Sequence, residues 1–123
     1  MAKKILVVDD SKTALLMERE ILEKRATYRC VTAADGQEAV EKAQQERPDL
    51  VLMDVVMPRM NGFEACKMMR RHPNTREIPI VLVTTRGEEA YMKAGFQSGC
   101  NDYITKPVDG AELVALVQSY LGE

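Results

Sequence analysis

The sequence has very little of several residue types on which catalytic and metal sites are often built. Among its 123 residues only one is histidine, three are cysteine and none is tryptophan. A single histidine cannot complete a multi-histidine metal site, and no two cysteines show the CxxC spacing of zinc ligands or a redox pair. We therefore expect Cys30, Cys66 and Cys100 to be small buried apolar residues, and His72 to lie at a helix end.

Long apolar runs and blocks of one charge are also absent from the sequence. The net charge is −2 and the basic residues are scattered, so there is no basic patch for nucleic acid or anionic lipid. The apolar run in MAKKILVV ends at Asp9, which makes it too short for a signal peptide or a membrane span. We expect a cytoplasmic protein with no nucleic-acid or membrane partner, and a single domain over residues 1–123 with no output domain.

What the sequence does contain is a regular alternation of short apolar segments with polar, helix-favouring ones. The five segments rich in valine and isoleucine are predicted strands, at residues 4–9, 28–34, 49–54, 78–85 and 102–106. Strands that alternate with helices predict an α/β fold, with a parallel sheet and helices on both faces. The fold class is therefore a single doubly wound (βα)5 domain, and we take its strand order, 2-1-3-4-5, from flavodoxin-like sheets.

The predicted helix starts share a signature. After Ser11 a first helix begins, and at the later starts a capping residue is followed three positions on by a glutamate that can reach back to it. These pairs are Asp35 with Glu38, Asn61 with Glu64, Thr85 with Glu88, and Asp109 with Glu112.

Three further groups of residues receive structural interpretations. Gly36 and Gly62 stand beside caps and are interpreted as turn residues. Arg70, Arg71 and His72 are interpreted as a solvated helix end. The methionines of the middle of the chain are interpreted as core filling: Met53, Met57, Met60, Met68 and Met69.

Polar residues stand where the predicted strands end. Asp9 and Asp10 end the first strand, Asp54 ends the third, Thr84 ends the fourth and Lys106 follows the fifth. The carboxyl ends of parallel strands share one edge of the sheet, so we expect these groups to meet there. Clustered carboxylates repel one another, and oxygen ligands without histidine or cysteine suit Mg²⁺ beside a phosphoryl group. Asp54 is the candidate nucleophile for phosphoryl transfer, with Lys106 as a counter-charge and the Thr84 hydroxyl as a hydrogen-bond donor.

Four segments carry a resemblance to a known family. LVVDDS, VLMDVVMPRMNG, VLVTT and DYITKP, in this order, resemble the signature blocks of the receiver domain of two-component response regulators, close to its stand-alone chemotaxis-type members. The resemblance runs from about residue 4 to residue 121. It implies that Asp54 is the phosphoacceptor, that Asp10 binds Mg²⁺ or Mn²⁺ directly, that Asp9 binds it in the outer shell or through water, and that the Val56 carbonyl completes the protein ligands.

The resemblance also implies a mechanism of switching. Thr84 and Tyr103 would form the switch pair, Lys106 would contact the phosphoryl group, and a cis peptide would join it to Pro107. A sensor histidine kinase or a small acyl phosphate would donate the phosphoryl group, and a partner protein would bind the face made by the fourth helix, fifth strand and fifth helix. The last helix has no lysine or arginine for a charge-paired dimer face, so we expect a monomer. The family varies at Val56 and Arg86, so the lifetime of the acyl phosphate is left open.

Other interpretations stay open at this point. Asp9 and Asp10 could be solvated turn residues, Thr84 an ordinary strand residue and Tyr103 plain sheet packing. The chain could be a phosphorelay intermediate instead of a terminal switch. In either case we expect it not to be an enzyme that acts on other substrates. A phosphoaspartyl hydrolase would place DxD on the first strand, where this chain has DDS, and a flavodoxin-like electron carrier would need a loop rich in glycine and hydroxyl groups where this chain has SKTALL.

Overall fold

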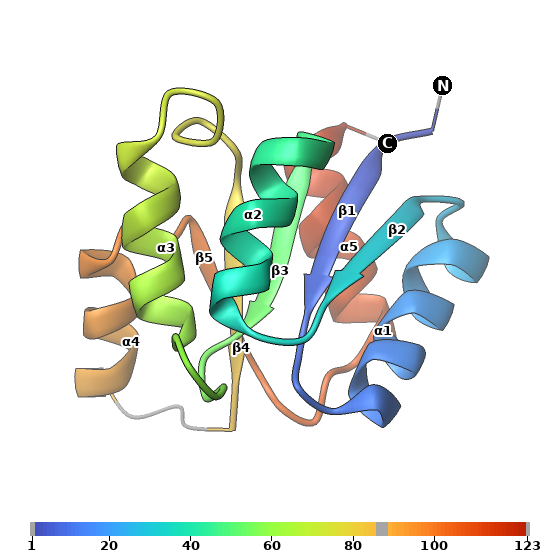
Figure 1. Ribbon diagram of the computed structural model, residues 1–123. Helices are drawn as coiled ribbons and strands as arrows, with labels where there is room; N and C mark the ends of the chain where they lie inside the picture. Colours follow the sequence, from blue (N-terminus) through green and yellow to red (C-terminus); the bar gives the residue numbers. More distant parts are fainter. Residues whose placement is uncertain (1, 86–88, 123) are drawn as a thin grey trace.

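A parallel sheet of five strands forms the centre of the molecule. The computed structural model describes residues 2–85 and 89–122, and within them the strands pair in the order β2-β1-β3-β4-β5 (Figure 1). The elements, in chain order, are β1 (Lys4–Val8), α1 (Lys12–Arg25), β2 (Arg29–Ala33), α2 (Gly36–Glu46), β3 (Leu50–Asp54), α3 (Gly62–Arg71), β4 (Ile80–Thr84), α4 (Glu89–Gln97), β5 (Asp102–Thr105) and α5 (Gly110–Leu121). The predicted fold class and strand order are confirmed.

The sheet separates two apolar cores because successive strand residues point to opposite faces. On β1, Leu6 and Val8 pack with α2 and α3, whereas Ile5 and Val7 pack with α1 and α5. Helices α1 and α5 therefore cover one face, and α2, α3 and α4 cover the other (Figure 1). The inner strands β1, β3 and β4 are buried almost throughout, which explains why their sequences are nearly continuous apolar runs.

Each strand is shorter than predicted at one or both ends. Strand β4 begins at Ile80 because Pro79 has no amide hydrogen for the sheet. At the other end of the sheet Asp9 lies beyond β1, where its carboxylate accepts a hydrogen bond of 2.9 Å from the amide of Ser11. The residues that were predicted as strand but lie outside the strands therefore belong to the loops at the two ends of the strands.

The predicted caps are present where the structure describes them. The side chains of Asp35, Asn61 and Asp109 accept hydrogen bonds of 2.8, 2.9 and 3.0 Å from the amide three positions later. Glu64 also reaches back to the amide of Asn61 at 3.1 Å, which completes a capping box. The remaining pair includes Glu88, which lies outside the described residues.

Arg70 corrects the interpretation of a solvated helix end. Its guanidinium donates to the carbonyls of Gly99 at 2.8 Å and Ile78 at 2.7 Å, and to the side-chain oxygen of Asn101 at 2.6 Å. The guanidinium therefore ties α3 to the loops that precede β4 and β5, and only Arg71, the next residue, is exposed as predicted. A planar fork of five donors can bind more oxygens at once than the three donors of a lysine.

Three smaller predictions concern the cysteines, the methionines and a membrane span. Cys66 and Cys100 are buried as predicted, but Cys30 is only half-buried because β2 is an edge strand. Met69 is fully buried, whereas its neighbour Met68 lies on the outer side of α3 and is 44% exposed. Among the described residues, no helix combines the length and the apolar character needed to cross a membrane.

Candidate phosphoacceptor and metal site

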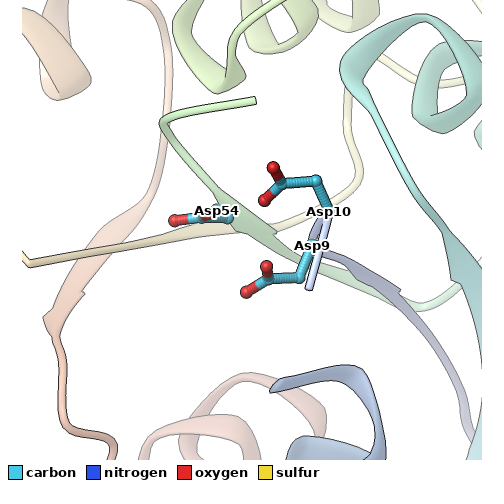
Figure 2. A group of neighbouring side chains, drawn as sticks. All are labelled: Asp9, Asp10 and Asp54. Carbon is cyan, nitrogen blue, oxygen red and sulfur yellow. The ribbon is translucent and has the colours of Figure 1, made fainter. Parts of the chain in front are cut away.

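Three carboxylates meet at the carboxyl edge of the sheet. Asp9 and Asp10 follow β1, and Asp54 is the last residue of its neighbour β3. Each offers an oxygen that lies within 4.8 Å of the others, and Figure 2 shows the side chains projecting to the same side of the two strands. Asp9 and Asp54 are buried, at 1% and 8% exposure, while Asp10 is exposed. The sequence prediction that these acids converge is confirmed.

Lys106 brings the positive charge to this cluster. Its ammonium lies 2.8 Å from Asp9 Oδ2 and 3.7 Å from Asp54 Oδ1, so that one amine is shared by two buried carboxylates. The backbone amide of Lys106 donates to the carbonyl of Thr84 at 2.7 Å, which fixes the loop after β5 against the end of β4. The cis peptide expected between Lys106 and Pro107 is present.

Burial and crowding change the proton affinity of these groups. Burial, and after it the charge of Asp9, raise the pKa of Asp54 to about 6, against the lowering effect of Lys106 and of the amide of Val55, which donates at 3.0 Å. For Lys106, burial lowers the pKa, but the hydrogen bond that its ammonium donates to Asp9 and the charge of Asp54 outweigh it and raise the pKa. Lys106 is therefore a protonated ammonium, and it lies beside the Asp54 carboxyl group, which holds its proton more tightly than usual.

The donor set fits a hard divalent cation. All three candidate side-chain ligands are carboxylates, and oxygen is the ligand that Mg²⁺ prefers in proteins. Two carboxylates 4.8 Å apart repel by roughly 3 kcal/mol at an effective dielectric of about 20. One ammonium does not balance three carboxylates, so Asp9, Asp10 and Asp54 would hold a cation that relieves this repulsion.

The loop after β3 is folded back tightly on the phosphoacceptor candidate. Gly62, the first residue of α3, donates its amide to the carbonyl of Val55 at 2.8 Å. A Cβ at Gly62 would lie 2.5 Å from the carbonyl oxygen of Asp54, so close backbone approach requires glycine there, not the turn geometry that the sequence suggested. Val56 lies in this loop with its side chain 61% exposed, and the metal-binding role of its carbonyl stays a prediction.

Thr84 and Tyr103 lie on the same face of the sheet. Tyr103 pairs with Leu82 in the ladder between β4 and β5, and Thr84 stands two residues beyond Leu82. Leu82 belongs to the core on the side of α4, and the Tyr103 ring packs against that core. Thr84 is buried and Tyr103 is partly buried, which places them as a switch pair requires, although that role stays a prediction. Arg86, which was expected at the mouth of the site, lies outside the described residues.

Glu18 is the residue near the site that the sequence interpretation missed. It lies in the middle of α1, yet only 4% of it is exposed. Burial raises its pKa to about 7, the charges of Asp9 and Asp54 raise it, and the charge of Lys106 lowers it. The available signal was positional: Glu18 stands four residues before Leu22, which is fully buried, so it faces inward on the helix.

Comparisons of the sequence agree with this geometry. The family model described as "Response regulator receiver domain" matches residues 5–118. Protein PilH of Pseudomonas aeruginosa is 40% identical over 118 residues, which cover 96% of this chain and 97% of PilH. The alkaline phosphatase synthesis transcriptional regulatory protein PhoP of Bacillus subtilis is 40% identical over 121 residues, and the match covers 98% of this chain but 49% of PhoP. The chain therefore spans the full length of one relative and about half of another.

Solved structures show the same architecture. The chemotaxis protein CheY4 of Vibrio cholerae superposes with a TM-score of 0.91 at 34% identity, covering 98% of this chain and 99% of that one. The receiver domain of the sensor histidine kinase PA1611 of Pseudomonas aeruginosa has a TM-score of 0.91 at 32% identity and covers 100% of both chains. That receiver domain carries a magnesium ion coordinated in its active site cleft.

Proposed function

Because the chain belongs to the family of response regulator receiver domains, we propose that it is a signalling switch controlled by phosphorylation of Asp54. Receiver domains of two-component response regulators generally signal in this way. The observation that carries the proposal is the convergence of Asp9, Asp10, Asp54 and Lys106 at one edge of the sheet. Residues 1–123 act in this proposal as one receiver domain.

The chemistry follows from the roles of the residues. A carboxylate oxygen of Asp54 attacks phosphorus, and the bond from phosphorus to the donor breaks, so that its electron pair leaves with the imidazole of a kinase phosphohistidine or with the carboxylate of a small acyl phosphate. Phosphoryl transfer depends mainly on positioning and on neutralisation of charge. Lys106 balances the transferred charge, and the Thr84 hydroxyl, at the end of the adjacent strand, donates a hydrogen bond to a phosphoryl oxygen.

A divalent cation belongs to the proposed reaction. Mg²⁺, or Mn²⁺ in its place, supplies charge neutralisation at the phosphoryl oxygens when it is bound. Asp10 and Asp54 would bind it directly, Asp9 in the outer shell or through water, and the Val56 carbonyl would complete the protein ligands. The support for this assignment is the all-oxygen donor set and the magnesium ion in the receiver domain of PA1611.

The proposed output is a changed protein-binding face. A phosphoryl group adds negative charge and acceptor oxygens beside Thr84, which draws that side chain toward the site and lets Tyr103 follow. The face formed by α4, β5 and α5 would then bind a downstream protein as a monomer. A sensor histidine kinase is the proposed donor, the cytoplasm the proposed location, and no nucleic acid or membrane takes part.

The pathway is proposed at a coarser level. A role in chemotaxis or motility has its support in the likeness to CheY4, which is a chemotaxis protein. A place inside a phosphorelay is the second candidate, because a receiver domain of similar structure belongs to the sensor histidine kinase PA1611. In both candidates the chain promotes only its own phosphorylation and dephosphorylation, so it is not an enzyme acting on other substrates.

The test is the intact mass of the protein after incubation with Mg²⁺ and acetyl phosphate. We expect the native chain to gain one phosphoryl group, and Asp54→Asn to gain none because the amide is not a nucleophile. The matched control is Asp49→Asn, which makes the same change just before β3, at the opposite edge of the sheet. Its carboxylate accepts the amide of Lys4 at 2.8 Å, and asparagine keeps that acceptor.

Three other outcomes of this experiment would contradict parts of the proposed function. Equal gain of mass in the native protein and Asp54→Asn would place the acceptor elsewhere. Steady turnover of a generic phosphoester, such as p-nitrophenyl phosphate, would favour a phosphoaspartyl hydrolase. Uptake that persists unchanged in excess EDTA would contradict the proposed cation.

A further inference from the structure

Glu18 occupies a position on α1 where an apolar residue would be ordinary. Ala14, Glu18 and Leu22 follow one another at intervals of four along the helix, so they form one inward-facing row. Leu22 is fully buried and Glu18 is 4% exposed. A glutamate is almost never buried to this extent unless a partner compensates for the loss of water.

The compensating group lies across a small cavity. This cavity has a volume of about 160 Å³ and separates α1 from the loop after β5. Glu18 lines it from the helix and Lys106 lines it from the loop, so the glutamate and the amine that serves the phosphoacceptor site border the same cavity. The remaining lining residues are mainly apolar: Ala14, Met17, Ile21, Pro107 and Val108. An apolar lining lowers the local dielectric constant, which strengthens the interaction between the two charges.

We propose that Glu18 is a positioning residue of the phosphoacceptor site, whose carboxylate attracts the Lys106 ammonium from the side of α1 and competes with Asp9 and Asp54 for its charge. This inference rests on the proposed function, because it assigns Lys106 to the phosphoryl group. The Lys106 ammonium already lies closer to Asp9, at 2.8 Å, than to Asp54, at 3.7 Å. The Glu18 carboxylate divides the charge of this ammonium among three acids instead of two.

The proposal has two consequences of opposite sign. With Glu18 present, Lys106 neutralises Asp9 and Asp54 less completely, so the acidic cluster attracts Mg²⁺ more strongly. For the same reason Lys106 is less available to an anionic phosphoryl donor, and the negative charge of Glu18 also repels that donor. Removal of the charge should therefore weaken Mg²⁺ binding and accelerate phosphorylation at saturating Mg²⁺. A merely structural residue would impair both.

The experiment uses the full chain with Glu18→Gln, which keeps the shape, and Glu18→Met, which keeps the length and restores an apolar side chain. The pH is set at about 8.5, above the pKa of about 7, so that the native carboxyl is ionised. Isothermal titration calorimetry gives the dissociation constant of Mg²⁺, and intact mass against time gives the rate with acetyl phosphate. Glu20→Gln is the matched control, because Glu20 lies on the same helix, exposed and paired with Lys24 at 3.2 Å.

In both Glu18 variants we expect the dissociation constant of Mg²⁺ to rise by roughly 3-fold and the rate at saturating Mg²⁺ to rise by a similar factor, as one nearby charge would produce. Glu18→Met should also unfold at higher temperature than the native chain, which separates the functional effect from damage to the fold. Glu18→Asp, which keeps the charge, should restore native values at least in part.

Several outcomes would overturn the inference. If both quantities worsen together, or neither changes while the native chain is phosphorylated on Asp54, Glu18 has no positioning role and the proposed function stands. If Glu20→Gln reproduces the effect, the cause is the general charge of α1. If the native chain takes up no phosphoryl group, the proposed function fails and this inference fails with it.

Discussion

Charged residues have different partners at the two edges of the sheet, where the parallel strands begin and where they end. At the edge where β4 and β5 begin, Arg70 donates to three backbone carbonyls and to the amide oxygen of Asn101, and that oxygen also accepts the amide of Ile80 at 2.8 Å. At the edge where the strands end, Lys106 pairs with the buried carboxylates of Asp9 and Asp54. At the first edge Arg70 satisfies polar groups internally, whereas the second edge brings three carboxylates together around the ammonium of Lys106.

The difference teaches which charges serve the fold and which serve the reaction. A guanidinium that satisfies buried carbonyls stabilises the loops it joins, and its removal leaves acceptors without donors. A cluster of like charges costs folding energy, but it can bind a cation and stabilise transferred charge. Substitutions at the two edges should therefore separate stability from reactivity.

The largest expected effect is on the reaction. Lys106→Met should slow phosphorylation of Asp54 by acetyl phosphate on the order of 1,000-fold, because a preorganised positive group at developing charge has that magnitude. The stability of the fold should change little, since Lys106 is surrounded by carboxylates whose repulsion a cation can relieve. Phosphorylation is followed by intact mass against time at saturating Mg²⁺.

Lys4→Met is the matched control for this prediction, because Lys4 begins β1 at the other edge and pairs with Glu46 at 3.1 Å. Its phosphorylation rate should stay at the native value. A similar rate for the native chain and Lys106→Met would show that the carboxyl edge does not depend on its amine.

The next effect is on stability. Arg70→Met should lower the free energy of unfolding by about 3 kcal/mol, because it leaves the carbonyls of Gly99 and Ile78 without their donor. Mg²⁺ affinity should not change, because Arg70 belongs to the opposite edge. Urea unfolding in EDTA measures the first quantity and calorimetry the second. Arg71→Met, an exposed neighbour, should be near neutral, and an equal loss in both variants would refute the role of Arg70.

The smallest effect is a pH dependence confined to the carboxyl edge. Burial, first of all, raises the pKa of Glu18 from 4.5 to about 7, and that of Asp54 from 3.8 to about 6. Below about pH 3.8 folded and unfolded chains both hold these protons. As the pH rises toward 7, only the folded chain still holds them, so its stability falls with pH.

Urea unfolding in EDTA across this range tests the prediction. Glu18→Gln should flatten the fall, whereas Asp49→Asn, at the opposite edge, should reproduce the native curve. Stability that rises between pH 5 and 7 in the native chain, or a fall that Glu18→Gln leaves unchanged, would contradict the shifted proton affinities.

Much of this fold was predictable because its signals are local. The capping side chains of Asp35, Asn61 and Asp109 bond to amides only three residues away, so the chain carries each helix start within a few positions. The apolar strands are recognisable because burial on both faces leaves no polar alternation. The acids and the lysine of the site were identified because each stands where a predicted strand ends.

What the sequence determined about this protein is therefore its alternation of strands and helices and the types of residue at the strand ends. The tertiary structure alone decided that Lys106 lies 2.8 Å from Asp9, that Arg70 turns inward to join the loops before β4 and β5, and that Glu18 is buried. The physical reason is that periodicity and caps act over a few residues. Distances between residues 97 positions apart, as for Asp9 and Lys106, depend on how the crossovers stack the helices on the sheet.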